Sequence, residues 1–377
     1  MADRSRGIRA AIARGSALLA ASVVLAATGA AGAAPVAAAA SRPVFRFADG
    51  RIDEASGIGV GIASPGVVYV QNDSGDSARF FAVDASTGAT LAVYWVPGAQ
   101  NVDWEDLAVA RDARGVPSVW LADIGDNDAV RQEVRIYRVD EPVVDRGRVG
   151  VELTTAEPSV WRLRYPDGPA DAEALAVAPG GTGYVVTKSL FGESAVYAVP
   201  ATADPARVQT LHRVAAIRFS MTGTPGGPLA AIGQLTVTGA AMSTDGRVLV
   251  VRTYTDAYLW RVSSGDIAAA LHGSPVRLAL PEQRQGEGVA VRGSTLLVDS
   301  EGVGSTVYAV PTPPLPTRSG PPAPTPVASE PSAVRNATGT TAQESTTAGR
   351  GPWLWFGLAG LALAGAGLAV SLRRRSR

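Results

Sequence analysis

Short apolar runs recur along residues 43–310, and glycine, proline, aspartate and serine bound each of them. Runs of this kind, rich in β-branched and aromatic residues, are typical of β-strands. They come in sets of three, and one set consists of Glu173–Val177, Gly183–Lys188 and Ala195–Val199. Apart from a helical turn near Gly265–Leu271, no helical period interrupts them. The pattern therefore predicts an all-β domain over residues 41–310, built from a repeated unit.

The spacing of these sets predicts the fold. Related openings begin at Glu54, Glu105, Glu173, Thr238 and Glu287, at intervals of 51, 68, 65 and 49 residues. Units of this length with three or four strands are the blades of a β-propeller. We predict five blades. Six blades are an alternative because the units that begin at Glu105 and Glu173 are long, and a two-sheet sandwich is a third arrangement.

A fourth, outer strand follows the third apolar run in four of the units. These outer strands are predicted at Leu91–Val96, Ser159–Tyr165, Val208–Phe219 and Val276–Leu280. The fifth unit ends at Val310 without one, and Pro43–Phe47 at the start of the domain can supply it. A ring closed by its own N-terminal strand has no exposed sheet edge at the junction.

The propeller geometry gathers the polar residues of the repeat at one place. The first strand of each blade lines the channel and starts at the face where the loops between second and third strands lie. We predict that an acidic rim at this mouth holds a metal ion through Glu54, Asp73, Asp76, Glu105, Asp123, Asp126, Glu287, Asp299 and Glu301. Crowded carboxylates repel one another unless cations, protons or hydrogen-bond donors accompany them. Oxygen-rich clusters suit Ca²⁺, which is the expected cofactor.

Further polar residues complete the predicted rim. The ligand-binding candidates are Glu173, Lys188, Arg252, Tyr254 and Asn127. Lys188 and Arg252 could hold an anion such as a phosphate or a carboxylate. A purely structural interpretation competes with this one, because aspartate and asparagine in such loops cap turns through the local backbone. In that interpretation Lys188 neutralises Glu173, and the charges around Trp104 flank a packed ring.

Composition and charge narrow the class of function. The chain has no cysteine and two histidines, so it offers no thiolate chemistry and little material for a histidine-based zinc site or catalytic triad. Its formal net charge is zero, but nine arginines lie in the two end segments beside one aspartate. Residues 41–349 therefore hold 25 basic and 33 acidic residues, a net charge of −8. An acidic domain argues against a nucleic-acid partner and favours cations.

The two ends of the chain predict export and anchoring. Residues 1–40 combine arginines, an apolar run and small residues in the order of a signal peptide. Residues 311–350 are rich in proline, threonine and serine, and predict an extended stalk. Residues 351–372 are long and apolar enough for a transmembrane helix, and the basic tail 373–377 places the C-terminus in the cytoplasm. We therefore expect a single-pass protein of the cell membrane with its propeller outside.

The blade openings, together with Asn72–Asp76 and Asp123–Asn127, resemble exported bacterial propeller proteins of the phytase-like esterase and WD40-like group. The resemblance covers about residues 43–310, and it implies a Ca²⁺-assisted ester or phosphoester hydrolase. Two hypotheses follow. The first is a binding module whose rim takes an envelope glycan, a protein or a small anionic ligand. The second is a Ca²⁺-dependent hydrolase that uses the same rim.

Overall fold

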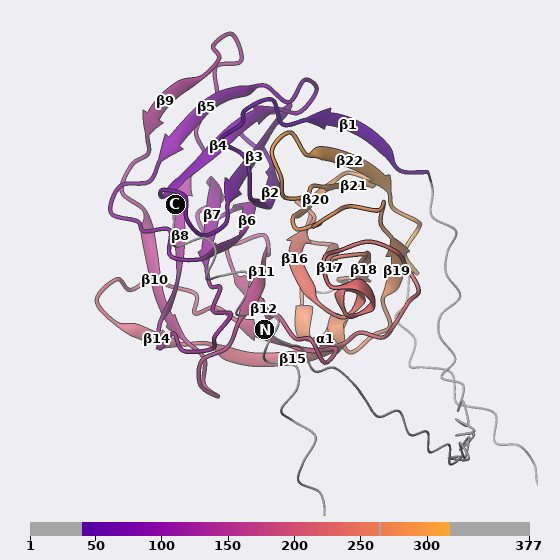
Figure 1. The fold of residues 1–377 in the computed structure, drawn as a ribbon. Coiled ribbons are helices and arrows are strands. Elements are labelled where there is room, and N and C mark those ends of the chain that lie inside the picture. Colours follow the sequence, from indigo (N-terminus) through magenta and orange to yellow (C-terminus); the bar gives the residue numbers. More distant parts are fainter. Residues whose placement is uncertain (1–39, 264, 317–377) are drawn as a thin grey trace, which may run out of the picture. The chain divides into compact units, whose positions relative to one another are not determined.

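The computed structural model describes residues 40–263 and 265–316, which form five mainly antiparallel sheets arranged as a ring (Figure 1). The ring is closed: each innermost strand contacts the next one, and the innermost strand of the last sheet contacts that of the first. The all-β, five-bladed propeller that the repeat predicts is thus confirmed. We number the blades 1 to 5 in chain order of their innermost strands.

The strands of each blade are given from the channel outwards. Blade 1 has β2 (Ala55–Val60), β3 (Val67–Asn72), β4 (Arg79–Asp84), β5 (Thr90–Trp95) and β9 (Val151–Thr154). Blade 2 has β6 (Trp104–Arg111), β7 (Pro117–Asp123), β8 (Val134–Asp140), β10 (Ser159–Arg164) and β14 (Val208–Thr210). Blade 3 has β11 (Ala172–Val177), β12 (Gly183–Thr187), β13 (Glu193–Ala198) and β15 (His212–Arg218). Blade 4 has β16 (Val237–Met242), β17 (Val248–Thr253), β18 (Asp256–Arg261) and β19 (Val276–Ala279). Blade 5 has β20 (Val289–Arg292), β21 (Thr295–Val298), β22 (Thr306–Pro311) and β1 (Arg42–Arg46).

The N-terminal strand closes the ring as predicted. β1 pairs antiparallel with β22, with Arg42 opposite Ala309 and Arg46 opposite Thr306. The last blade is therefore assembled from the two ends of the domain (Figure 1). Two short helices complete the described structure: η1 (Ala230–Gln234) precedes blade 4, and α1 (Ile267–Leu271) lies within it at the predicted helical turn. The side chain of Asp266 caps α1 by accepting a hydrogen bond from the N–H of Ala269 at 2.9 Å.

The two long units do not contain a sixth blade; each adds a strand to the preceding blade. β9 follows β8 of blade 2 in the chain but pairs parallel with β5 of blade 1. β14 follows β13 of blade 3 but pairs parallel with β10 of blade 2. The prediction of one outer strand over Val208–Phe219 was therefore wrong, since β14 and β15 belong to different blades. The chain changes blade at Leu211, whose side chain is buried between blades 2 and 3.

The hydrophobic core lies between neighbouring blades. Each of five clusters of buried side chains joins one pair of adjacent sheets. In the cluster between blades 2 and 3, the rings of Trp120 and Trp161 lie 5.1 Å apart. The alternation of buried residues along each strand thus packs both faces of every sheet, as propeller geometry requires.

The predicted signal peptide, most of the stalk, the transmembrane helix and the tail lie outside the described residues. Among the residues that are described, no helix is long and apolar enough to span a bilayer.

Candidate functional site

The channel mouth is built from a β-bulge that recurs in the innermost strands. The pairing register shifts after the first residue of β2, β6, β11 and β16, which leaves Ser56, Glu105, Glu173 and Thr238 unpaired in the ladder. A bulge re-aims the side chain of the extra residue. Glu287 stands at the matching place in blade 5, directly before Gly288 and β20. The bulge therefore defines one tier of the mouth, with a glutamate in three blades and a hydroxyl residue in two.

The bulge positions show which residues of the blades are equivalent, and this differs from the equivalence that the sequence pattern suggests. The sequence pattern aligned Glu54 with Glu105 and Glu173, but the bulge places Ser56 at that position. Glu54 instead matches Asp103 and Asp171, each of which lies two residues before its bulge residue. Blades 1 to 3 thus present an acid at this outer position, where blades 4 and 5 have Thr236 and Gln285.

Backbone hydrogen bonds connect a third set of residues to these outer positions. The N–H groups of Asp73, Gly125, Lys188 and Glu301 donate to the carbonyl oxygens of Glu54, Asp103, Asp171 and Gln285, respectively, at 2.9–3.1 Å. Each bond joins the loop after the second strand to the start of the first strand of the same blade. The side chains of Asp73, Lys188 and Glu301 are thereby held at the mouth by the sheet, so the site stands on rigid elements.

Two groups of carboxylates meet around Glu105. One oxygen each from Asp73, Asp103 and Glu105 lie within 4.8 Å of one another, and so do oxygens of Glu105, Asp171 and Glu173. Glu105 and Glu173 are almost fully buried, while the three aspartates are partly exposed. We call these five residues the acid cluster. Such groups can hold a metal ion, because hard divalent cations take several oxygen ligands from side chains.

The absence of a side chain at Gly125 leaves room for two carboxylates of the acid cluster. A Cβ at this position would collide with Oε1 of Glu105 and with the carboxylate of Asp103. Any residue other than glycine would displace both side chains, so the close approach of backbone and carboxylates requires glycine here.

The charges of the acid cluster are only partly balanced. Lys188 donates from Nζ to Oε1 of Glu173 at 2.5 Å. Burial, opposed by Lys188 and reinforced by nearby acids, raises the pKa of Glu173 to about 7. Burial together with the charges of neighbouring acids also raises the pKa of Asp73 to about 7 and that of Glu105 well above its usual value. Burial by itself lowers the pKa of Lys188, but the surrounding acids outweigh it and raise the pKa.

Titratable residues of blades 4 and 5 interact electrostatically with the acid cluster. Burial and the charges of Glu173 and Glu301 raise the pKa of Glu287 well above its usual value. Burial and the charge of Asp73 raise the pKa of Glu301 to about 7. Among the residues that the structure describes, Oε2 of Glu287 is buried without a hydrogen-bond partner. Tyr254 lies at the same mouth, where burial and the charge of Glu287 raise its pKa.

Other residues of the predicted rim are engaged in protein contacts. Asp76 pairs with Arg79 at 2.8 Å, and Asp123 pairs with Arg131 at 2.8 Å. Asp126 accepts from the N–H groups of Val130 and Arg131. These three acids hold the loops in which they lie, as the structural interpretation expects, and Asn127 is exposed in the same loop as Asp126.

Arg252 and Asp299 form a buried bridge between blades 4 and 5. Arg252 is fully buried, and its guanidinium donates to the carbonyl oxygens of Gly288 and Asp299 and to Oε1 of Gln283. Asp299 accepts from the N–H of Gly288 at 2.7 Å. The structure therefore separates Arg252 from Lys188 in function, since both terminal nitrogens of its guanidinium already donate to two backbone carbonyls and to Gln283.

Sequence reasoning assigned no site role to Asp103 and Asp171. Both lie two residues before a bulge glutamate, at the spacing that Glu54 has from Ser56. That repeated spacing was the available signal. It was hidden because the alignment used the first acid of each opening and not the position of the bulge.

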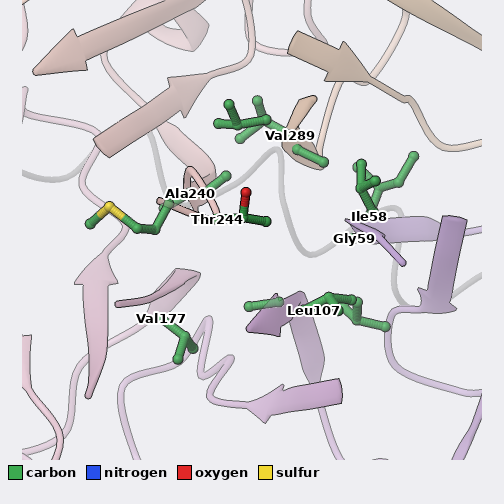
Figure 2. A pocket seen from close by; sticks show the side chains of 14 residues that line it. Ile58, Gly59, Leu107, Val177, Ala240, Thr244 and Val289 are labelled. Carbon is green, nitrogen blue, oxygen red and sulfur yellow. The ribbon is translucent and has the colours of Figure 1, made fainter. Parts of the chain in front are cut away.

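The other end of the channel is apolar and narrow. Ile58, Leu107, Val177, Ala240 and Val289 surround a cavity of about 30 Å³ there (Figure 2). A cavity of this size holds about two water molecules. Any ligand larger than water must therefore reach the acid cluster from the mouth.

Exposed apolar side chains lie on the loops of blades 3 and 4 beside the mouth. They are Leu190, Phe191, Met221, Leu229 and Ile232, and Phe191 is 96% exposed. The loop of Phe191 follows Lys188 directly, and a Cβ on Gly227 or Gly233 in the loop of Leu229 and Ile232 would contact Tyr254. We call these five residues the apolar rim.

Comparisons with known proteins give no sequence match and a remote structural similarity. No protein-family profile and no curated protein sequence matches the chain. Among solved structures, the PQQ-bound aldose sugar dehydrogenase from Streptomyces coelicolor is similar, with 13% identity, coverage of 72% of this chain and 98% of that chain, and a TM-score of 0.39. A gluconolactonase from Xanthomonas campestris is similar with 14% identity, coverage of 73% and 98%, and a TM-score of 0.37.

The fold and the site define a five-bladed β-propeller with an acidic channel mouth. The narrower assignment to the phytase-like and WD40-like group stays a prediction.

Proposed function

We propose that the protein is a cation-dependent binding module, in which the acid cluster holds a divalent cation, Ca²⁺ by its ligand preference, and the bound ion captures a partner at the channel mouth. The observation that carries this proposal is the meeting of two carboxylate triads at Glu105. The terminal segments support display of the module at the cell surface, in line with the predicted signal peptide, stalk and membrane helix.

Charge balance explains why a cation is needed. Asp73, Asp103, Glu105, Asp171 and Glu173 face one lysine, so an anion would be repelled from the mouth. A divalent ion adds the missing positive charge and replaces the protons that burial otherwise retains. It can also leave coordination positions for an oxygen-bearing partner, since Ca²⁺ takes roughly six to eight ligands.

The apolar rim supports the binding role. A partner that touches the bound ion would also cover Phe191 and Leu190, and burial of apolar area contributes roughly 25 cal/mol per Å². Affinity and orientation then come from different parts of one face: the apolar rim provides contact area, and the ion selects an oxygen ligand.

The replacement Glu105→Gln tests the cation site. We expect it to weaken Ca²⁺ binding by about tenfold or more, because this side chain belongs to both triads and a charged ligand is lost. The melting temperature in chelator should stay equal or rise, because the variant removes like-charge repulsion. Isothermal titration of the full-length protein with CaCl₂ and thermal unfolding check both results. The matched control Glu157→Gln changes an exposed acid and should leave both values unchanged.

A second variant changes a glycine that lies against the acid cluster. Gly125→Ala keeps every carboxylate but pushes Glu105 and Asp103 aside, so it should also weaken Ca²⁺ binding. Wild-type affinity in both variants would show that the acid cluster is not the cation site.

A metal-assisted ester or phosphoester hydrolase is the second candidate, and the position of Lys188 favours it. Lys188 lies beside the triad of Glu105, Asp171 and Glu173, where it could hold the anionic group of a substrate. A bound divalent ion would supply Lewis acidity toward the ester oxygen. Glu173, with a pKa raised to about 7, could exchange a proton near neutral pH.

The replacement Lys188→Met separates the two candidates. If the protein is a phosphoester hydrolase, Ca²⁺-dependent turnover of p-nitrophenyl phosphate should fall by about 100-fold or more, because its anionic phosphate loses the lysine, while Ca²⁺ binding is kept or tightened. Steady-state assays of wild type, Lys188→Met and Glu105→Gln check this result. Turnover in the wild type no faster than in Glu105→Gln would remove the hydrolase and leave the binding module.

A further inference from the structure

The channel mouth offers hydrogen-bond donors as well as carboxylates, and the donors come from blades 3 and 4. Lys188 directly follows β12 and Tyr254 directly follows β17, just as Asp73 follows β3 in blade 1. The two donors and the acid cluster therefore share one face of the ring. An ammonium has three N–H groups, and within the described structure that of Lys188 makes one hydrogen bond, to Glu173.

The hydroxyl of Tyr254 is a second donor at this mouth. The segment 227–233 packs against its side chain, because a Cβ on Gly227 would lie 2.8 Å from Cβ of Tyr254 and one on Gly233 3.4 Å from Cδ2. Within the described residues the hydroxyl forms no hydrogen bond, and it is not among the unpartnered side-chain oxygens that are closed to solvent. Burial raises the pKa of Tyr254 and the charge of Glu287 reinforces the shift, so the phenol keeps its proton.

The acid cluster supplies acceptors that a ligand can reach. Asp73, Asp103 and Asp171 are each partly exposed. An ionised carboxylate has two oxygens and only accepts, so an oxygen that does not touch the ion can take a proton from a ligand. Within the described part of the chain the carboxylate of Asp103 accepts no hydrogen bond, which leaves both of its oxygens for ion and ligand. Acceptors thus come from blades 1 to 3 and donors from blades 3 and 4, around one cation site.

This mixture of charges and donors discriminates between ligand classes. An oxyanion offers acceptors only, and even with a divalent ion bound the five carboxylates outnumber the three positive charges of the ion and Lys188. An ammonium offers donors only and would meet the ion and Lys188. A hydroxyl group offers both: its oxygen can coordinate the ion or accept from Tyr254, and its proton can go to an aspartate.

We propose that the partner captured at the channel mouth is a neutral carbohydrate, which reaches the bound cation through two adjacent hydroxyl groups. This inference rests on the cation-binding function proposed above. Because Ca²⁺ takes roughly six to eight oxygen ligands, two hydroxyl oxygens can complete its coordination beside the carboxylates. Their protons are donated to acid-cluster oxygens, and a further hydroxyl of the sugar accepts from Tyr254. Tyr254 therefore selects the carbohydrate and is not a ligand of the ion.

Ligand-observed NMR of the full-length protein with the methyl α-glycosides of glucose, mannose and galactose tests the proposal. At least one glycoside should bind in CaCl₂ with a dissociation constant on the order of 1 mM, and its binding should disappear in EDTA. The 3-deoxy analogue of that glycoside has no pair of adjacent hydroxyls and should bind about tenfold more weakly or worse. Sodium acetate, which offers acceptors only, should not displace the glycoside.

A variant that removes one hydroxyl assigns the signal to the mouth. Tyr254→Phe should weaken glycoside binding by about fivefold, the effect of one lost hydrogen bond. Tyr184→Phe is the matched control and should leave it unchanged, because Tyr184 lies near the start of β12, at the end of blade 3 away from the mouth.

Titration of the same samples with CaCl₂ separates the possible failures. If Ca²⁺ binds but no glycoside does, or if acetate displaces the glycoside, the carbohydrate proposal is wrong and the cation site stands. Wild-type glycoside affinity in Tyr254→Phe, or binding that persists in EDTA, would also overturn it. If Ca²⁺ itself does not bind, the cation site and the carbohydrate proposal fail together.

Discussion

Replacing Asp106 by alanine is expected to destabilise the propeller by about 3–6 kcal/mol, because it leaves three buried backbone donors without an acceptor. The carboxylate of Asp106 is fully buried and accepts from the N–H groups of Leu107, Leu175 and Ala240. These groups belong to blades 2, 3 and 4, so one side chain ties three innermost strands together at the centre of the ring. In a domain of this size the melting temperature should fall by about 10 °C or more.

Thermal unfolding followed by circular dichroism measures this effect. Two further variants serve as a conservative comparison and as a control. Asp106→Asn should cost less than alanine, because an amide oxygen placed at Oδ2 keeps the bonds to Leu175 and Ala240 and loses only the one to Leu107. Asp128→Ala, which removes an exposed acid, should leave the melting temperature unchanged. If Asp106→Ala unfolds close to the wild-type temperature, water in the channel must satisfy the three donors.

Asp106 also shows where sequence reasoning reaches its limit. Its neighbours in the sequence indicated either a metal rim or a tryptophan flanked by solvated charges, and Asp106 is neither exposed nor part of the acid cluster. The alternation of a strand assigns a residue to one face, but a bulge moves its side chain relative to that rule. The bulge before Asp106 arises from pairing with β7 and cannot be recognised from the spacing of apolar residues alone.

The fold itself followed from the sequence because it depends on repetition. Five sets of strands, the closing strand Arg42–Arg46 and the gathering of openings at one mouth all rest on the period of apolar runs. The strands β9 and β14 could not be predicted in the same way. They add to the edge of the preceding blade, and no local pattern states which edge a strand will join.

The candidate site was predictable only in part for the same reason. Glu105 and Asp73 lie together as expected, whereas Asp103 and Asp171 entered the acid cluster through the register of the bulge. Residues such as Asp76 and Asp126 have the same side-chain chemistry as the acid cluster. Whether such an acid faces the channel or caps its own loop depends on arginines and N–H groups that only the folded loop brings near.

Without a divalent cation, stability is expected to fall as the pH rises from about 5 to about 8. Burial raises the pKa of Asp73 and of Glu173 to about 7 in the folded protein, above the values near 4 of an unfolded chain. The folded state therefore holds more protons than the unfolded state over this interval. Its stability is greatest at the acidic end and declines as these carboxyls ionise, at a cost on the order of 3 kcal/mol for each group.

Below about pH 5 the trend should reverse, because other carboxyls have the opposite shift. The side-chain hydrogen bond from Arg162 lowers the pKa of Glu133 to about 2, and bonds from Ser86 and Arg146 lower that of Asp84. The folded state loses stability when these groups become protonated. A stability maximum near pH 5 is thus expected in the presence of chelator.

Calcium should change this profile in a way that tests the site and its electrostatics together. A bound divalent ion favours the ionised carboxylates, so the gain in melting temperature on adding Ca²⁺ should be small near pH 5 and large near pH 8. Calorimetry of the full-length protein across this range, with chelator and with CaCl₂, measures both curves. In Glu105→Gln the gap between the two curves should narrow, because this variant binds Ca²⁺ more weakly. A gain from Ca²⁺ that does not depend on pH would mean that the ion binds elsewhere, because a site made of these carboxyls must exchange protons for the metal.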